Sequence, residues 1–245
     1  MMKLDLLVIT VHPDDAELGC GGTIAQQVAL GRKVGVVDLT RGELGSRGSA
    51  EIRDQEAANA AKILGLSVRG NLRMRDGFFK NDEAHQLQIV EVIRRYQPEI
   101  VIANALRDRH PDHARAGDLV NDAVFLSGLR MIETIDSQSG DIQQAYRPRL
   151  LLQLIQDQHI NPDIVVDVSA YWETKIKAVR AYSSQFHSDS YQEGSDEPQT
   201  YISSPDFLDY IEGRGREFGK YIGAKHGEGY TCRRLLGVDD LFHLR

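Results

Sequence analysis

The sequence contains little cysteine: Cys20 and Cys232 are the only two, and they lie far apart in the chain. Two distant cysteines form neither a disulfide framework nor a CxxC metal pair, so we expect a reducing, cytoplasmic environment. Long apolar runs are also missing, since the stretch Leu4–Val11 is interrupted by Asp5 and is too short for a signal or membrane segment. The formal net charge of −7 leaves no basic excess for phosphate binding. We therefore expect a soluble cytoplasmic protein that binds neither nucleic acid nor membranes.

What the sequence does contain is a regular alternation of apolar strands and amphipathic helices. Short β-branched runs predict strands at Leu4–Val11, Lys33–Leu39, Val68–Met74, Glu99–Ala105, Leu150–Ile155 and Ile164–Val168. Helical periodicity covers Thr23–Leu30, Glu51–Leu64, Ala84–Tyr96, a segment after Pro111, Tyr171–Phe186 and Phe207–Ile222. This order is typical of right-handed βαβ units, and no linker divides the chain. We predict one α/β domain over residues 1–245, Rossmann-like and doubly wound, with a mostly parallel sheet and helices on both faces.

Two clusters of metal-binding residue types follow two of the predicted strands. His12-Pro13-Asp14-Asp15 comes directly after the first strand, and His110-Pro111-Asp112-His113 follows the fourth strand after a short connection. Ligands of open parallel sheets bind beyond the carboxyl ends of the strands. A spacing of three residues directs the outer side chains of each cluster the same way. Either cluster alone is more typical of a solvated turn, but the pair predicts one metal site.

The residue types allow a role for each member of the two clusters. A catalytic zinc site has three His, Asp or Glu ligands and one position left for water. We assign the ligands to His12, Asp15 and His113, with Zn²⁺ as the expected metal and Fe²⁺ as the alternative. Asp14 is then the general base, and His110, as an imidazolium, stabilises the oxyanion or protonates the leaving amine. Asp112 is placed to orient a histidine.

The same segments resemble a known enzyme family. VHPDDAELGCGGTIA (Val11–Ala25) and DRHPDHARAG (Asp108–Gly117) are similar to the two signature regions of the PIG-L/LmbE-like deacetylases. That family hydrolyses N-acetylglucosaminyl conjugates with zinc on a Rossmann-like sheet. The resemblance implies the same metal ligands, base and catalytic histidine as above, places Arg53 at the substrate site, and implies a homo-oligomer.

Three further segments resemble the bacillithiol-biosynthesis branch of the family, namely Val36–Leu66, Ser184–Phe186 and Phe218–Tyr230. This likeness implies N-acetylglucosaminyl malate as the substrate. Arginine binds carboxylates through paired hydrogen bonds, so Arg53 and Arg109 are interpreted as substrate contacts. Arg47 is interpreted as an ordinary surface residue.

Other interpretations stay open at this point. The substrate could be an inositol-linked N-acetylglucosamine, a chitooligosaccharide or a thiol conjugate, and a non-catalytic metal- or nucleotide-binding module is the remote alternative. The glycines around Cys20 lack the G-x-G-x-x-G spacing and indicate tight packing, with Cys20 as a buried small residue. The polar stretch His187–Ser204 predicts a long surface loop, either a lid or an interface.

Overall fold

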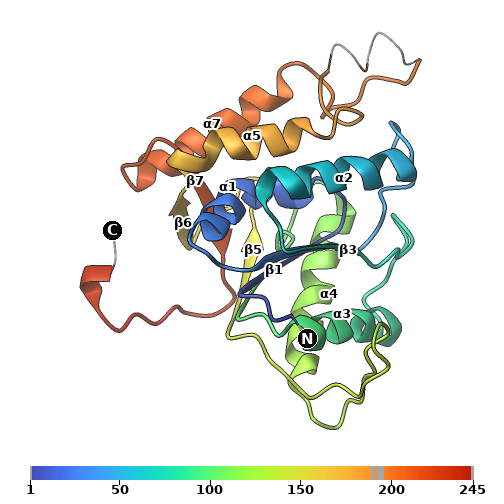
Figure 1. Cartoon of the computed structure of the whole chain (residues 1–245). Helices are drawn as coiled ribbons and strands as arrows, with labels where there is room; N and C mark the ends of the chain where they lie inside the picture. The colour runs from blue at the N-terminus through green and yellow to red at the C-terminus, as the bar shows by residue number, and fades with distance from the viewer. Residues whose placement is uncertain (1, 189–190, 192–195, 244–245) are drawn as a thin grey trace.

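The computed structural model describes residues 2–188, 191 and 196–243, and it confirms the α/β fold (Figure 1). The strands are β1 (Leu6–Thr10), β2 (Val34–Asp38), β3 (Val68–Asn71), β4 (Ile100–Ala103), β5 (Leu150–Leu154), β6 (Ile164–Asp167) and β7 (Gly227–Thr231). The α-helices are α1 (Asp15–Ala29), α2 (Ala50–Leu64), α3 (Glu83–Tyr96), α4 (Pro111–Ser127), α5 (Trp172–Arg180) and α7 (Phe207–Tyr221). Within these described residues, no helix is both long and apolar enough to cross a membrane.

The seven strands form one sheet in the order β3-β2-β1-β4-β5-β7-β6. β7 pairs antiparallel with both of its neighbours, and the pairings among β1 to β5 are parallel. The strand order reverses between β1 and β4, which makes the carboxyl ends of these two strands the crevice where such sheets bind ligands. Both predicted clusters follow these strands.

Helices cover both faces of the sheet, as predicted. In Figure 1, α1, α2, α5 and α7 lie above the sheet and α3 and α4 lie below it. Two separate apolar cores correspond to these layers: residues of β1 alternate between them, with Val8 in the upper core and Leu7 and Ile9 in the lower. This alternation is the period of two that a strand buried on both faces requires.

Helix α1 begins at Asp15, eight residues before the predicted start at Thr23. The prediction was wrong because glycine disfavours helices in isolation, whereas here the glycines allow close packing. A Cβ atom at Gly19 would lie 2.6 Å from Leu154, and one at Gly22 would lie 2.7 Å from Val168. The interpretation of these glycines as packing residues is therefore supported, and Cys20, which is fully buried, marks a kink between them.

Two other elements differ from the prediction. The sequence predicts one helix over Tyr171–Phe186, but α5 ends at Arg180 and turns follow it. Strand β7 was not predicted, since two of its five residues are glycine, a residue that is rare in strands. The glycines fit because a Cβ atom at Gly229 would lie 2.9 Å from the ring of Phe218.

Candidate metal centre and active site

A pocket of about 470 Å³ lies beyond the carboxyl ends of β1 and β4. All the residues that the sequence assigns to the site line it: His12, Asp14, Asp15, Arg53, Arg109, His110, Asp112 and His113. Residues of the two clusters thus share one cavity, because the strands that precede the clusters are neighbours in the sheet.

His12, Asp15 and His113 form a compact set of donor atoms. Each offers one atom, and the three atoms lie within 4.8 Å of one another. Asp15 lies between the two imidazoles: its Oδ2 is 3.7 Å from Nδ1 of His12, and its Oδ1 is 3.2 Å from Nε2 of His113. Two imidazoles and one carboxylate are the ligand types of catalytic zinc sites and equally suit Fe²⁺.

The far side of each imidazole contacts a carboxylate that sequence reasoning missed. Nε2 of His12 donates to Oδ1 of Asp76 over 3.0 Å, and Nδ1 of His113 donates to Oδ1 of Asp108 over 3.0 Å. Such bonds fix the orientation of a ligand histidine and leave its other nitrogen unprotonated for the metal. Asp76 carried no sequence signal, because it lies alone in a loop. Asp108 lies only five residues before His113 and could have been found as its partner.

The carboxylates around the two histidines stabilise positive charge. Burial alone lowers the pKa of His12, but Asp112, Asp76 and Asp15 outweigh burial and raise it to about 9. Burial likewise lowers the pKa of His113, and Asp15 and Asp108 raise it to about 10. A site that holds protons this firmly in the absence of another cation is electrostatically suited to a divalent metal ion, which displaces those protons.

Asp15 is held by an amide network. Its Oδ2 accepts from Nδ2 of Asn104 over 3.0 Å, and its Oδ1 accepts from Nε2 of Gln156 over 3.0 Å. Burial raises the pKa of Asp15, but His113 and His12 lower it well below its usual range. Asp15 is therefore ionised, and Asn104, which holds it, directly follows β4.

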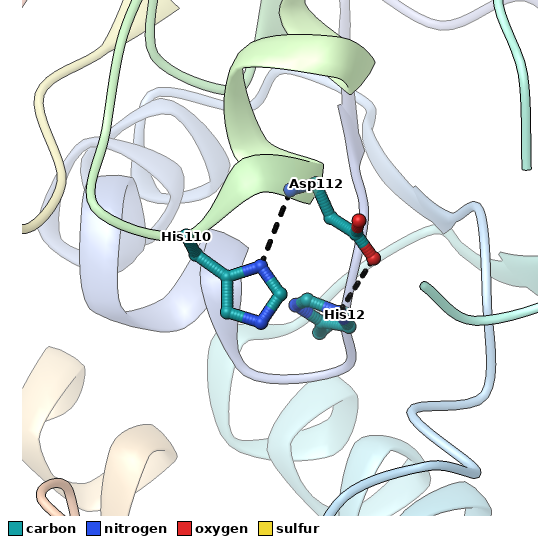
Figure 2. Close-up of side chains that lie close together, drawn as sticks. All are labelled: His12, His110 and Asp112. Atoms are coloured by element: carbon teal, nitrogen blue, oxygen red, sulfur yellow. Dashed lines mark hydrogen bonds and ion pairs between the residues drawn. The ribbon is translucent and has the colours of Figure 1, made fainter. Parts of the chain in front are cut away.

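A second donor set shares His12 and adds His110 and Asp112 (Figure 2). Donor atoms of this second set already form hydrogen bonds with backbone N–H groups. Nδ1 of His110 accepts from the backbone N–H of Asp112 over 3.3 Å, and Oδ2 of Asp112 accepts from the N–H of Gly77 over 2.9 Å. Asp112 also lies 3.8 Å from Nε2 of His12, on the side away from Asp15. The first set fits a metal ion better, and that Asp112 orients a histidine stays a prediction.

His110 caps helix α4, with Pro111 at the first helical position. Because its Nδ1 accepts the capping hydrogen bond, the proton of the neutral ring is on Nε2. Burial and the neighbouring His12 and His113 lower the pKa of His110. The expected imidazolium is thus disfavoured at rest, and the neutral ring, stacked 4.9 Å from that of His113, offers an N–H donor instead.

Asp14 has an unusual backbone conformation. Its φ of 120° lies in a region that non-glycine residues rarely adopt, directly before helix α1. Nη2 of Arg53 donates to Oδ2 of Asp14 over 2.9 Å, and both side chains are buried. Burial raises the pKa of Asp14 to about 7, although the Arg53 guanidinium acts to lower it. A buried carboxyl group with a pKa near neutrality has the property required of a general base.

The remaining arginines of the pocket differ in exposure. The Arg109 side chain is 56% exposed, and its Nε lies 3.1 Å from Oδ2 of Asp157. The interpretation of Arg47 as a surface residue is wrong: it is 4% exposed, because its guanidinium donates to the carbonyl oxygens of Ser184 and Pro198. Arg214 of α7, which sequence reasoning missed, donates from Nη2 to the carbonyl oxygen of Asp157 over 3.0 Å.

The predicted loop His187–Ser204 lies partly outside the described residues, at 189–190 and 192–195. Its last part, Thr200–Ile202, lines the pocket, and the Tyr201 ring lies 5.1 Å from the Arg109 guanidinium. This end of the loop therefore borders the site.

Comparison with known proteins finds relatives that are named as deacetylases and as a hydratase. Residues 7–124 match the PIG-L family model, described as GlcNAc-PI de-N-acetylase. The chain is 30% identical to diacetylchitobiose deacetylase of Thermococcus kodakarensis over 234 residues, 91% of this chain and 81% of the relative. It is 28% identical to 4-oxalmesaconate hydratase of Pseudomonas putida, over 74% of each chain.

Two further likenesses bear on the branch and the fold. The chain is 26% identical to a probable N-acetyl-α-D-glucosaminyl L-malate deacetylase of Bacillus subtilis, over 75% of this chain and 84% of the relative. The crystal structure of the conserved protein TT1542 from Thermus thermophilus superposes with a TM-score of 0.82 at 36% identity, covering 96% of this chain and 97% of that one. These relatives do not single out the bacillithiol branch that the sequence resembles.

Proposed function

Because this chain belongs to the PIG-L family, we propose that it is a metal-dependent deacetylase that hydrolyses the N-acetyl group of an N-acetylglucosamine conjugate. One observation carries the proposal. A buried carboxylate with a pKa near neutrality, Asp14, is directly adjacent in sequence to Asp15 of the His12–Asp15–His113 donor set and lines the same pocket. A base beside a cation site is the arrangement that metal-assisted amide hydrolysis uses.

The metal ion would be held by His12, Asp15 and His113, with Asp76 and Asp108 orienting the two imidazoles. A divalent ion bound there supplies charge that polarises the acetamide carbonyl and lowers the pKa of a water molecule. Zn²⁺ is proposed as the native metal, and Fe²⁺ suits the same ligands.

The protein residues supply the proton transfers. Asp14 accepts a proton from the attacking water as the new C–O bond forms, and Arg53 holds the Asp14 carboxylate in place through its 2.9 Å hydrogen bond. His110 donates a hydrogen bond from Nε2 to the negatively charged oxygen of the tetrahedral intermediate and so stabilises it. The C–N bond then breaks as the amine nitrogen takes up the proton that Asp14 accepted. The products are the free amine and acetic acid, which keeps the second proton of the water until it ionises to acetate in solution.

We propose N-acetylglucosaminyl malate as the substrate. Arg109 and Arg214 both line the pocket and contact Asp157, one at its carboxylate and the other at its backbone carbonyl. The hydrogen-bond partner of Arg214 is an uncharged carbonyl oxygen, so its guanidinium can also bind a substrate carboxylate. A malate group carries two carboxylates, whereas diacetylchitobiose, the substrate named for the Thermococcus relative, carries none.

Acetate release tests the activity and the substrate together. The purified protein, loaded with Zn²⁺ or Fe²⁺, is assayed with N-acetylglucosaminyl malate and with diacetylchitobiose, with and without a chelator. We expect a higher kcat/KM for the malate conjugate, and loss of activity with the chelator. Equal or higher kcat/KM for diacetylchitobiose overturns the malate assignment. No acetate from any N-acetylglucosamine conjugate, together with hydration of 4-oxalmesaconate, overturns the deacetylase assignment.

The arginine variant Arg214→Gln refines the substrate test. It should raise KM for the malate conjugate about tenfold or more, since a charge-assisted hydrogen bond is lost. The KM for an uncharged conjugate should stay unchanged. An equal effect on both substrates removes the role given to Arg214.

A further inference from the structure

The segment after β7 exposes an unusual amount of apolar surface. We call residues 235–243 the arm. Leu235 is 97% exposed, Leu241 75% and Phe242 95%, and Leu236 and Val238 are also exposed. Figure 1 shows the arm in red, running clear of the helices and the sheet. Single exposed apolar residues are common, but five within eight positions of one segment are typical of a surface that another chain covers.

A groove of about 610 Å³ begins where the arm leaves the body. Its floor is apolar and comes from the end of α4 and the start of β5: Val124, Phe125, Leu126, Pro148 and Leu151. Its rim carries four arginines, Arg147, Arg149, Arg233 and Arg234, against the single carboxylate of Asp122. The groove is distinct from the candidate active site, with which it shares no lining residue.

The charges of the arm and the groove are complementary. The arm carries Asp239 and Asp240 between its apolar residues, and both are exposed. On the rim, Arg149 pairs with Glu99 and Arg233 pairs with Asp118. Arg147 and Arg234 instead donate hydrogen bonds to the backbone carbonyl oxygens of Phe125 and Arg149. These oxygens carry no net charge, so the bonds do not offset the positive charge of the two guanidinium groups.

We propose that two copies of this chain exchange arms, so that the arm of each copy occupies the groove of the other. Because Arg233 and Arg234 line the groove and directly precede the arm, each arm departs from the edge of the groove that receives its counterpart. Two such contacts related by a twofold axis form a closed, self-complementary interface. The apolar arm residues fill the groove floor, and Asp239 and Asp240 meet Arg147 and Arg234. This interface is independent of the proposed activity.

Charge reversal tests the exchange with two complementary variants of the full chain. The arm variant carries Asp239→Lys and Asp240→Lys, and the groove variant carries Arg147→Glu and Arg234→Glu. Sedimentation velocity over a range of concentrations measures the dissociation constant of each. We expect the wild type to associate, and each variant alone to dissociate at least about tenfold more readily, because both contacts of its dimer become repulsive.

The mixture of the two variants is the decisive measurement. In a mixed pair both contacts join opposite charges again, so association should return to within a few fold of the wild type. A control with Arg32→Glu and Lys33→Glu, exposed residues outside the groove, should associate like the wild type. A wild type that is monomeric at every concentration overturns the proposal. So do variants that associate normally, and folded variants, judged by circular dichroism, whose mixture stays dissociated.

Discussion

Arg53 and Asp14 form a buried ion pair that joins helix α2 to the turn after β1. Nη2 of Arg53 lies 2.9 Å from Oδ2 of Asp14 and also contacts the carbonyl oxygen of Pro13. Nη1 of the same guanidinium donates to Gln185 over 3.3 Å. The arginine therefore holds both the backbone and the side chain of the turn, and it is a positive charge directly beside the proposed base.

Replacing Arg53 with Gln should move the acid limb of the pH–rate profile to higher pH. Burial raises the pKa of Asp14 to about 7, and Arg53 opposes that rise, so its removal raises the pKa further. Activity requires the ionised base, and therefore increases as the pH passes its pKa. The profile of kcat against pH measures the shift. Arg32→Gln, at an exposed position, is the control that should leave the limb in place. An acid limb that moves to lower pH in Arg53→Gln contradicts the assignment of Asp14.

Asp14→Asn should lower kcat between about a hundredfold and ten-thousandfold while the protein keeps its metal. Asparagine is the appropriate replacement, because it tolerates positive φ better than alanine does, and the φ of this position is 120°. A parallel metal analysis separates loss of the base from loss of the ion. Loss of a general base lowers kcat by far more than about tenfold. A variant that keeps more than about a tenth of the wild-type kcat would therefore exclude Asp14 as the base.

Asp108→Asn should weaken metal binding about tenfold to a hundredfold, since the carboxylate that orients His113 becomes a neutral amide. Competition with a chromophoric chelator measures the dissociation constant directly, without an activity assay. Asp82→Asn provides a matched control: Asp82 lies 2.6 Å from Nδ1 of His85 at the surface, away from the pocket. An equal metal affinity in Asp108→Asn and Asp82→Asn would show that Asp108 does not support the site.

A residue of this site could be predicted only where its neighbours in the sequence form a recognisable pattern. The two clusters were recognisable because one comes directly after a strand and the other follows the next strand of the sheet after a short connection, and parallel neighbouring strands bring their carboxyl ends together. Asp76 and Arg214 were not, because their positions depend on how a loop and a distant helix pack, and neither has a short-range pattern. Which residues hold the ligands in place is a property of tertiary structure.

The sequence likewise predicted the main part of the fold but not all of its strands. The alternation of strands and helices correctly indicated a doubly wound sheet, since burial of a strand on both faces requires a continuous apolar run. β7 lacks that run: its Glu228 is buried, and its carboxylate accepts hydrogen bonds from Nζ of Lys175 over 2.6 Å and from the backbone N–H groups of Gly22 and Thr23. A charged residue in a central strand is compatible with burial only through a partner remote in sequence, so local patterns could not reveal it.

Arg69→Met should destabilise the protein by about 3–5 kcal/mol, the cost of leaving buried carboxylates without their cation. Arg69 lies 2.6 Å from Glu17 and 2.8 Å from Asp38, and both carboxylates are almost fully buried. Arg216→Met is the control, since Arg216 is 59% exposed and its pair with Glu212 should contribute about 0–1 kcal/mol. Urea unfolding measures the free energy of each variant.

The pH dependence of the Arg69→Met effect gives a sharper test than its size. Burial raises the pKa of Asp38 to about 7 even with Arg69 in place. Without the arginine the pKa rises further, so the folded variant binds a proton that the unfolded chain, with a pKa near 4, has already released. A raised folded-state pKa contributes stability at low pH that is lost as the pH rises through that pKa. The difference between wild type and Arg69→Met should therefore be larger at pH 8 than at pH 5. A difference that is constant over this range, or larger at pH 5, contradicts the buried ion pair as its cause.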